Sequence, residues 1–191
     1  MTKQELKEII REDKTYYFGG FLLRIWRIIT HNPLYIRGKY IIVSRKEGYY
    51  RLHHDTLAGK LLYAWYARKK NILGERLHIE LGPAEFGRRL KIFHNDIVVN
   101  SGAVIGDDCE LYGNNCIGNR GSAYPPCEAP MLGKHVSVGV GAQIIGRVKI
   151  GNHIMISSMS LVNKDVNDTH SVWGGIPVRK LRDLKEDNYG Y

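Results

Sequence analysis

One periodicity constrains the fold of this chain more than any other feature. An aliphatic residue recurs at every sixth position from Ile105, and the series resumes after one interruption: Ile105, Leu111, Ile117, then Leu132, Val138, Ile144, Ile150, Ile156 and Val162. A helix turns a side chain by about 600° over six residues, and an amphipathic strand repeats every second residue, so neither explains the series. Three short strands per coil explain it, with each anchor inside a triangular prism. The sequence therefore predicts a left-handed parallel β-helix of hexapeptide repeats, a mainly β fold behind an N-terminal α-helical segment.

Smaller residues follow the anchors at a fixed distance. Small or aliphatic side chains stand four places beyond most anchors: Cys109, Val136, Ala142, Val148, Ile154, Ser160 and Val166. They suit the corners of the prism, where space is short. Coils stacked about 4.8 Å apart would place like side chains in ladders that repeat every three hexads. The periodic stretch, residues 79–168 less one loop, predicts about four coils.

The interruption itself predicts a loop. The step from Ile117 to Leu132 is nine residues longer than one hexad, and the inserted residues include Pro125, Pro126 and Pro130. Proline cannot donate to a strand ladder, so residues 118–131 must leave the prism. Loops on a rigid scaffold often carry function, although a tolerated surface insertion is the alternative.

The charge separates the chain into segments. Residues 1–77 hold 16 Lys and Arg against 7 Asp and Glu, whereas the remainder is balanced. We therefore expect a basic N-terminal helical segment over 1–77, the β-helix with its loop over 78–170, and a C-terminal tail over 171–191. A basic surface suits anionic lipid or an acidic polymer, but no nucleic-acid recognition motif accompanies it.

Helical signals in the basic segment predict three helices. Thr2 and Glu5 form a capping box for a helix to about Asp13. An apolar stripe over 21–29 predicts a second helix that stops at Asn32-Pro33, and Asp55 would cap a third to about Lys70. Residues 40–43 fit helix or strand. The apolar residues of the second and third helices, with Leu57, Leu61, Leu62 and Trp65 inward, predict a small bundle; a helix lying on a membrane surface is the alternative.

The chain has no signature of export or of a disulfide framework. No window approaches the roughly 20 apolar residues of a membrane span, and the N-terminus lacks a signal-peptide pattern. The three cysteines form no CxxC pair, so structural zinc is not expected. We therefore expect a cytoplasmic protein. It would be located at the inner face of the membrane if the basic segment makes a peripheral contact there.

Two strings carry a resemblance to a known family. Residues 93–106 read FHNDIVVNSGAVIG, and residues 172–179 read VWGGIPVR. The first resembles the catalytic stretch of serine O-acetyltransferases and of O-acetyltransferases from capsule and exopolysaccharide clusters, in which a His precedes a G-I-V-V/I-N run. The second is similar to the family's V-x-x-G-V/I-P-A-R/K ending. The resemblance implies a homotrimer with acetyl-CoA bound in grooves between subunits, and His94 as the general base, with no metal.

The resemblance also implies a partner for the base, where this chain departs from the family pattern. One of the family's acids precedes the His in the sequence, at the position where this chain has Ile79 followed by Glu80. The family's serine-specific members have Asp directly before the His, where this chain has Phe93, with Asp96 two places after His94. The expected orienting carboxylate is therefore Glu80 or Asp96, with a backbone carbonyl as the alternative.

The acceptor is suggested by a second departure. Serine acetyltransferases carry another His in the loop, and Ala129 stands in its place. This favours a sugar hydroxyl in cell-surface polysaccharide biosynthesis over free serine, which remains the alternative acceptor. Tyr112, one regular coil after His94 and expected to stack above it, and Tyr124 in the loop would line a sugar site, with interface packing as the alternative.

For acetyl-CoA, the resemblance implies backbone groups of Gly141 and Ala142, and Ser158 one coil later. Met159 is bulkier than the Gly usual in the family, so the pantetheine path would differ there. Three cations are candidates for the CoA phosphates, although a solvated surface is the alternative for each: Lys164, Arg179 and Lys180.

Two other classes of function share the expected fold. A γ-type carbonic anhydrase needs three His on zinc, and His135 and His153, which are one regular coil apart, should stack on one corner, but no HxxxxH pair is present. A non-catalytic β-helix scaffold would need neither His94 nor the loop.

Overall fold

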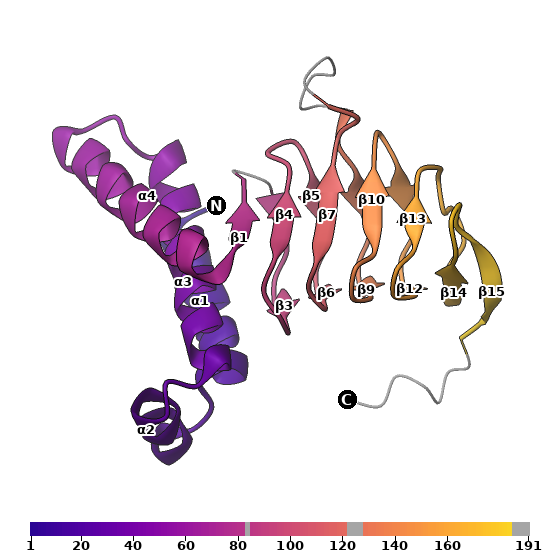
Figure 1. Ribbon diagram of the computed structural model, residues 1–191. Coiled ribbons are helices and arrows are strands. Elements are labelled where there is room, and N and C mark those ends of the chain that lie inside the picture. Colours follow the sequence, from indigo (N-terminus) through magenta and orange to yellow (C-terminus); the bar gives the residue numbers. More distant parts are fainter. Residues whose placement is uncertain (83–84, 122–127, 185–191) are drawn as a thin grey trace. The chain divides into compact units, whose positions relative to one another are not determined.

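The computed structural model describes residues 1–82, 85–121 and 128–184. They form two compact units, Met1–Ile79 and the chain from Glu80 onward. The first unit is helical and the second is a parallel β-helix (Figure 1). None of the described helices combines the length and the apolar character that crossing a bilayer requires.

Four helices make up the N-terminal unit: α1 (Lys3–Phe18), α2 (Phe21–Ile29), α3 (Pro33–Leu52) and α4 (Leu57–Leu77). The Thr2–Glu5 capping box opens α1 as expected. The second helix, α2, already ends at Ile29, and the Asn32-Pro33 dipeptide that was expected to stop it instead begins α3, with Asn32 as the cap and Pro33 in the first turn. Residues 40–43 lie within α3 and are helical. The cap of α4 is Thr56, whose hydroxyl accepts a hydrogen bond from the Gly59 N–H at 3.0 Å, so the prediction of Asp55 was wrong by one residue.

The apolar stripes of two helices are not covered by the chain itself. No residue of α2 is buried, and Leu22, Trp26 and Ile29 are each more than 60% exposed. Along α4 the side chains expected inward are exposed too, from 37% at Leu62 to 75% at Leu57. The predicted bundle therefore forms mainly from α1, α3 and the opposite side of α4. A stripe shows that a helix has an apolar face, not what covers that face.

The strands of the second unit form the three faces of a prism. The first face has the strand order β1-β4-β7-β10-β13, from β1 (Ile79–Leu81), β4 (Ile97–Val99), β7 (Asn115–Gly118), β10 (Gln143–Ile145) and β13 (Leu161–Val162). The second face has the order β11-β8-β5-β2, from β2 (Glu85–Phe86), β5 (Val104–Ile105), β8 (Met131–Leu132) and β11 (Lys149–Ile150).

The third face closes each coil and carries the end of the described chain. Its order is β15-β14-β12-β9-β6-β3, from β3 (Lys91–Ile92), β6 (Glu110–Leu111), β9 (Ser137–Val138), β12 (Ile154–Ile156), β14 (Ser171–Gly174) and β15 (Arg179–Asp183). Only β15 is antiparallel among the pairs of this face. Residues from the expected tail thus pair with the prism.

The hexad anchors fill the prism, as predicted. Each of the nine anchors is at most 4% exposed. The smaller residues four places beyond them are also buried, including Cys109, Val136 and Ala142 at 0%. The fold is the predicted left-handed hexapeptide β-helix.

The number of turns is about five rather than about four, since the first face alone has five stacked strands. The extra turn escaped the six-residue count because its spacing is irregular. Buried side chains follow one another there at Leu81, Ile92, Val99 and Ile105, and the step from Ile92 to Val99 is one longer than a hexad.

The loop insertion has the predicted length. Ile117 pairs with Ile144 in the coil that contains the loop, whereas Ile144 pairs with Val162 in the regular coil that follows. The first of these two separations exceeds the second by nine residues. The insertion falls in the sequence between β7 and β8, the strands that flank the corner between the first and second faces.

Candidate active site

His94 lies at the corner that joins the third face to the first, between β3 and β4. Residues of successive coils line this corner above it, and backbone hydrogen bonds tie them together. The Gly141 N–H donates to the Gly113 oxygen at 2.9 Å, and the Met159 N–H donates to the Val140 oxygen at 2.9 Å. We call this row the His94 corner, comprising His94, Gly113, Gly141, Ser158, Met159 and Gly175. The structure thus brings His94, Gly141 and Ser158 onto one edge of the prism.

An additional residue in the first turn makes His94 project. Ile92 pairs with Leu111 on the third face, and Ile97 pairs with Asn115 on the first face. The separation in sequence is one residue greater for the first pair than for the second. The segment between Ile92 and Ile97 therefore holds one residue more than the segment above it, and the side chain of His94 is exposed there. Bulges of this kind re-aim a side chain and are over-represented beside active sites.

Gly113 is the residue directly above this bulge. A Cβ at Gly113 would lie 2.6 Å from the Cβ of His94, closer than real atoms approach, and its φ of +113° also disfavours an L side chain. Because Gly113 has no side chain, the chain at His94 can pack this closely against it.

We expect Gly113→Ala to displace His94 and to lower turnover by about 10²-fold, the cost of misplacing a catalytic group by about 1 Å. Gly175→Ala is the matched control, because Gly175 also has a positive φ of +100° but its nearest neighbour would be 3.5 Å from the new Cβ. Steady-state kinetics of both variants check this. Equal losses would mean that backbone strain, not the position of His94, causes the effect.

Tyr112 stacks on Phe93 rather than on His94. The two rings are parallel within 16° with centroids 4.5 Å apart. The prediction that Tyr112 lies above His94 was wrong because it assumed a regular coil, and the bulge makes the local repeat one residue longer. The Tyr112 hydroxyl donates to Glu110 at 3.1 Å, so the ring is fixed from both sides beside the bulge.

Glu110 is a buried carboxylate at 2% exposure, shared by three neighbours. Lys91 forms an ion pair with it at 3.0 Å, and the hydroxyls of Tyr112 and Ser137 donate to it at 3.1 and 3.2 Å. Sequence reasoning missed both Glu110 and the role of Phe93. The sequence did contain a signal for the aromatic stack, because Phe93 and Tyr112 are two aromatic residues that stand one irregular turn apart.

The two predicted orienting carboxylates are both exposed. Asp96 occupies a left-handed position of the corner with φ +61°, and Glu80 lies on β1. The described structure shows no hydrogen bond from the imidazole of His94 to either one. Their role stays a prediction.

The cofactor residues differ in what they can offer a ligand. The Ala142 side chain is fully buried, and its N–H donates to the Gly139 oxygen at 3.1 Å. The Gly141 N–H is also occupied, because it donates to the Gly113 oxygen of the neighbouring coil, and the Gly141 oxygen accepts from Gln143 Nε2 at 3.2 Å. Ser158 is exposed. A ligand would therefore meet the bare Cα of Gly141 and the hydroxyl of Ser158.

Met159 covers that bare position. Its Sδ lies 2.5 Å from where a Cβ of Gly141 would be, and its side chain is 70% exposed. If acetyl-CoA lies along this row as the family resemblance implies, Met159→Ala should uncover Gly141 and lower the KM for acetyl-CoA by severalfold with little change in kcat, since the thioether covers Gly141 and not His94. An unchanged or higher KM would mean that Met159 itself contacts the ligand.

The three candidate phosphate cations are all exposed, and they differ in their partners. Lys180 bridges Asp168 at 2.7 Å and Asp183 at 2.6 Å, and its contact with Asp168 raises the pKa of its ammonium group. Arg179 begins β15, and Lys164 follows β13. Lys180 would have to leave two carboxylates to bind a phosphate.

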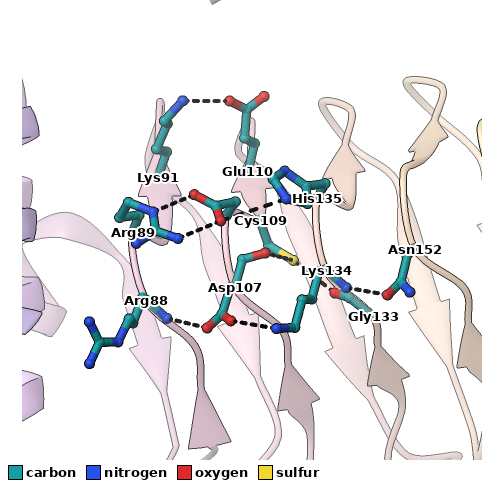
Figure 2. A network of polar contacts seen from close by, with 11 residues as sticks. Arg88, Arg89, Lys91, Asp107, Cys109, Glu110, Gly133, Lys134, His135 and Asn152 are labelled. Carbon is teal, nitrogen blue, oxygen red and sulfur yellow. Dashed lines mark hydrogen bonds and ion pairs between the residues drawn. The ribbon is translucent and has the colours of Figure 1, made fainter. Parts of the chain in front are cut away.

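The corner between the second and third faces is a contrasting, self-paired row (Figure 2). Arg89 forms a two-point ion pair with Asp108 at 2.6 and 2.7 Å. Asp107 accepts from the Arg88 N–H at 2.8 Å and pairs with Lys134 at 3.0 Å. The Arg88 N–H lowers the pKa of Asp107, and the Arg89 guanidinium lowers that of Asp108. These charges serve the stacking of coils.

The cysteine beside this row is not a nucleophile. Burial raises the pKa of the Cys109 thiol to about 12, and its Sγ lies 3.2 Å from the Gly133 oxygen. A thiol so held carries a negligible thiolate fraction at neutral pH.

Three histidines continue the same corner. His135 stacks on His153 with centroids 4.5 Å apart, as predicted, and His153 stacks on His170 at 4.4 Å. Their rings are parallel and do not converge on a point. Within the described ranges, no group of three or more His, Cys, Asp or Glu side chains could hold a metal ion.

This stack should make the β-helix acid-sensitive. Burial, followed by the neighbouring His135 and His170, lowers the pKa of His153. The unfolded chain therefore takes up a proton at higher pH than the folded chain, and stability falls as pH drops below about 6.5, the unfolded value. We expect the midpoint of thermal unfolding to decrease from pH 7 to 5, and His153→Asn to decrease less, measured by circular dichroism. Parallel slopes for both proteins would contradict this.

The described loop residues lie at a different corner of the prism from His94. Tyr124 falls outside the described residues. Ala129, which is 2% exposed, and Pro130 lie at the corner between the first and second faces, where the Pro130 oxygen accepts from the Val104 N–H at 3.0 Å. His94 lies at a different corner.

Comparison with known proteins identifies relatives, although no family model matches the chain. A serine acetyltransferase of Staphylococcus aureus is 32% identical over 146 residues, covering 71% of this chain and 66% of the relative. One of Helicobacter pylori is 29% identical over 150 residues, covering 73% and 84%. One of Buchnera aphidicola is 25% identical over 157 residues, covering 81% and 58%. The chain thus spans little more than half the length of some relatives.

Solved structures show the same fold. The serine acetyltransferase of Brucella abortus superposes with a TM-score of 0.73 at 18% identity, covering 96% of this chain and 71% of that one. Its complex with coenzyme A superposes with a TM-score of 0.72 at 19% identity, covering 96% and 70%. Sequence and fold agree: this chain is a homologue of the serine acetyltransferases, built as a hexapeptide-repeat left-handed β-helix behind a helical segment.

Proposed function

We propose that the chain is an acetyl-CoA-dependent O-acetyltransferase that uses His94 as its general base. The observation that carries the proposal is the His94 corner, where a bulge exposes one imidazole at the foot of a row containing Gly113, Gly141 and Ser158. Relatives named serine acetyltransferases, and a neighbour solved with coenzyme A, support this chemistry.

The reaction follows from a neutral imidazole beside a thioester. His94 takes the proton of the acceptor hydroxyl as its oxygen attacks the acetyl carbonyl. The tetrahedral intermediate then collapses with loss of the CoA thiolate, which receives the proton from the imidazolium. An ester bond forms, a thioester bond breaks, and His94 returns to its starting state. General-base catalysis of this kind contributes roughly 10²–10⁴-fold.

The comparisons favour serine as the acceptor, which sequence analysis had placed second. The relatives carry that name, and another neighbour is a serine acetyltransferase solved with cysteine. We therefore propose serine, or a small hydroxyl compound like it, as the first acceptor. A sugar hydroxyl remains a second candidate because Ala129 replaces the family's loop His and the Phe93–Tyr112 stack offers an aromatic face.

The test is a competition among acceptors. Purified protein is incubated with acetyl-CoA and an equimolar mixture of serine, homoserine, nucleotide sugars and oligosaccharides, and acetylated products are identified by mass spectrometry. O-acetylserine should dominate. A dominant acetyl sugar would leave the chemistry in place and replace the acceptor, whereas an N-acetylated product would contradict O-transfer.

The proposal includes a homotrimer, supported by the family resemblance and by the described ends of the loop, which lie at a different corner of the prism from His94. Light scattering should give three times the chain mass.

The proposal also includes a peripheral contact of the basic helices with an anionic membrane, supported by the exposed Leu22, Trp26 and Ile29 of α2. Co-sedimentation with phosphatidylserine vesicles, lost in Trp26→Ser/Ile29→Ser, would support it.

A further inference from the structure

The helical unit contains a pocket that the transferase chemistry does not use. Its volume is about 540 Å³, within the usual range for small-molecule sites. The floor and walls are apolar or aromatic and come from α1, α3 and α4: Phe18, Tyr35, Ile42, Val43, Ile72 and Leu73. Phe18, Tyr35 and Ile42 are at most 9% exposed, whereas Ile72 at the opening is 40% exposed.

Three lysines rim this pocket, one from each helix: Lys14, Lys39 and Lys69. All three are exposed, and no ion pair joins any of them to a carboxylate in the described structure. Lys39 and Lys69 instead lie over aromatic rings, with Nζ 4.7 Å from the Tyr35 centroid and 3.6 Å from the Trp65 centroid. Among the described residues, no Asp or Glu lines the pocket.

Two other cations of the same unit do form ion pairs with carboxylates. Lys70, the next residue after Lys69, pairs with Glu47 at 3.3 Å, and Arg45 pairs with the buried Asp13 at 3.1 Å. Lys70 and Arg45 are thus paired with carboxylates, whereas within the described ranges the three lysines at the pocket are not. An apolar interior with an uncompensated positive rim is complementary to a ligand with an apolar body and an anionic end.

We propose that this pocket binds a single-chain fatty acid, with the acyl chain among the apolar residues and the carboxylate between Lys14, Lys39 and Lys69. Apolar burial supplies affinity and the lysines select the head group. A second copy of this helical unit is a poor occupant, because residues 1–77 hold 16 Lys and Arg against 7 Asp and Glu and repel a like surface. The proposal does not depend on the acetyltransferase assignment.

The test titrates the full chain with octanoate, decanoate and dodecanoate below their micelle concentrations, by isothermal calorimetry. Each buried methylene contributes about 0.8 kcal/mol, so affinity should rise about fourfold per methylene until the pocket is full. Two controls separate the contributions of the carboxylate and of the acyl chain. Acetate has the carboxylate without a long chain, and dodecyl maltoside has a twelve-carbon chain with an uncharged head group. Both should bind at least tenfold more weakly than dodecanoate.

Variants locate the site. Lys14→Gln/Lys39→Gln/Lys69→Gln should weaken dodecanoate at least tenfold, whereas Lys7→Gln/Lys46→Gln/Lys60→Gln, which changes the same charge on the same three helices, should not. Ile72→Trp at the exposed opening should also block binding, with circular dichroism confirming the fold. No binding, binding without chain-length dependence, equal affinity for dodecyl maltoside, or attachment to anionic vesicles without binding of monomeric dodecanoate would each overturn the proposal.

Discussion

His94→Ala should lower turnover by roughly 10²–10⁴-fold while leaving the fold and the affinity for CoA nearly unchanged. The side chain is exposed at a bulged corner and contributes nothing to the prism core, so its loss should not affect stability. The candidate CoA residues lie further along the corner: Gly141 is two coils away, about 10 Å at the usual strand spacing. Kinetics, calorimetry with CoA and thermal unfolding measure the three quantities separately.

A matched control for that variant is His135→Ala. His135 is also exposed and also at a corner, but it belongs to the self-paired row with Asp108. It should keep wild-type turnover. If His94→Ala keeps wild-type turnover, or if both variants lose equally, His94 is not the base.

Arg45→Met should destabilise the helical unit by about 3–5 kcal/mol, because it removes a cation that is paired with a buried carboxylate. Asp13 has a fully buried side chain, and the Arg45 Nε lies 3.1 Å from its Oδ2. Denaturant unfolding followed by helical circular dichroism measures the loss. The double variant Asp13→Leu/Arg45→Met removes both charges and should recover most of the stability. A loss under about 1 kcal/mol would mean that solvent reaches Asp13.

Sequence alone predicted the prism because its signal is local and repeated. Each anchor of the regular series stacks on equivalent anchors of the adjacent coils, so the six-residue spacing alone predicts the positions of all of them. The nine-residue insertion and the His135–His153 stack follow from the same rule.

The first turn departs from this rule, and the candidate site lies there. One extra residue before Ile97 lengthens the repeat, which exposes His94 and moves Tyr112 onto Phe93. A repeat length derived from the regular coils cannot predict which coil departs from that length. The helical stripes failed for another reason: α2 has a strong apolar face, yet nothing in a stripe says whether the chain, a partner or a lipid covers it.

The measurement that tests the central claim most directly is acceptor-dependent release of CoA thiol from acetyl-CoA by the purified wild-type chain. The account predicts release that saturates with both acetyl-CoA and serine, yields one O-acetyl ester per thiol, and falls to near background in His94→Ala. Thiol release that is no faster than in buffer with every hydroxyl acceptor, or that proceeds equally in His94→Ala, would contradict it.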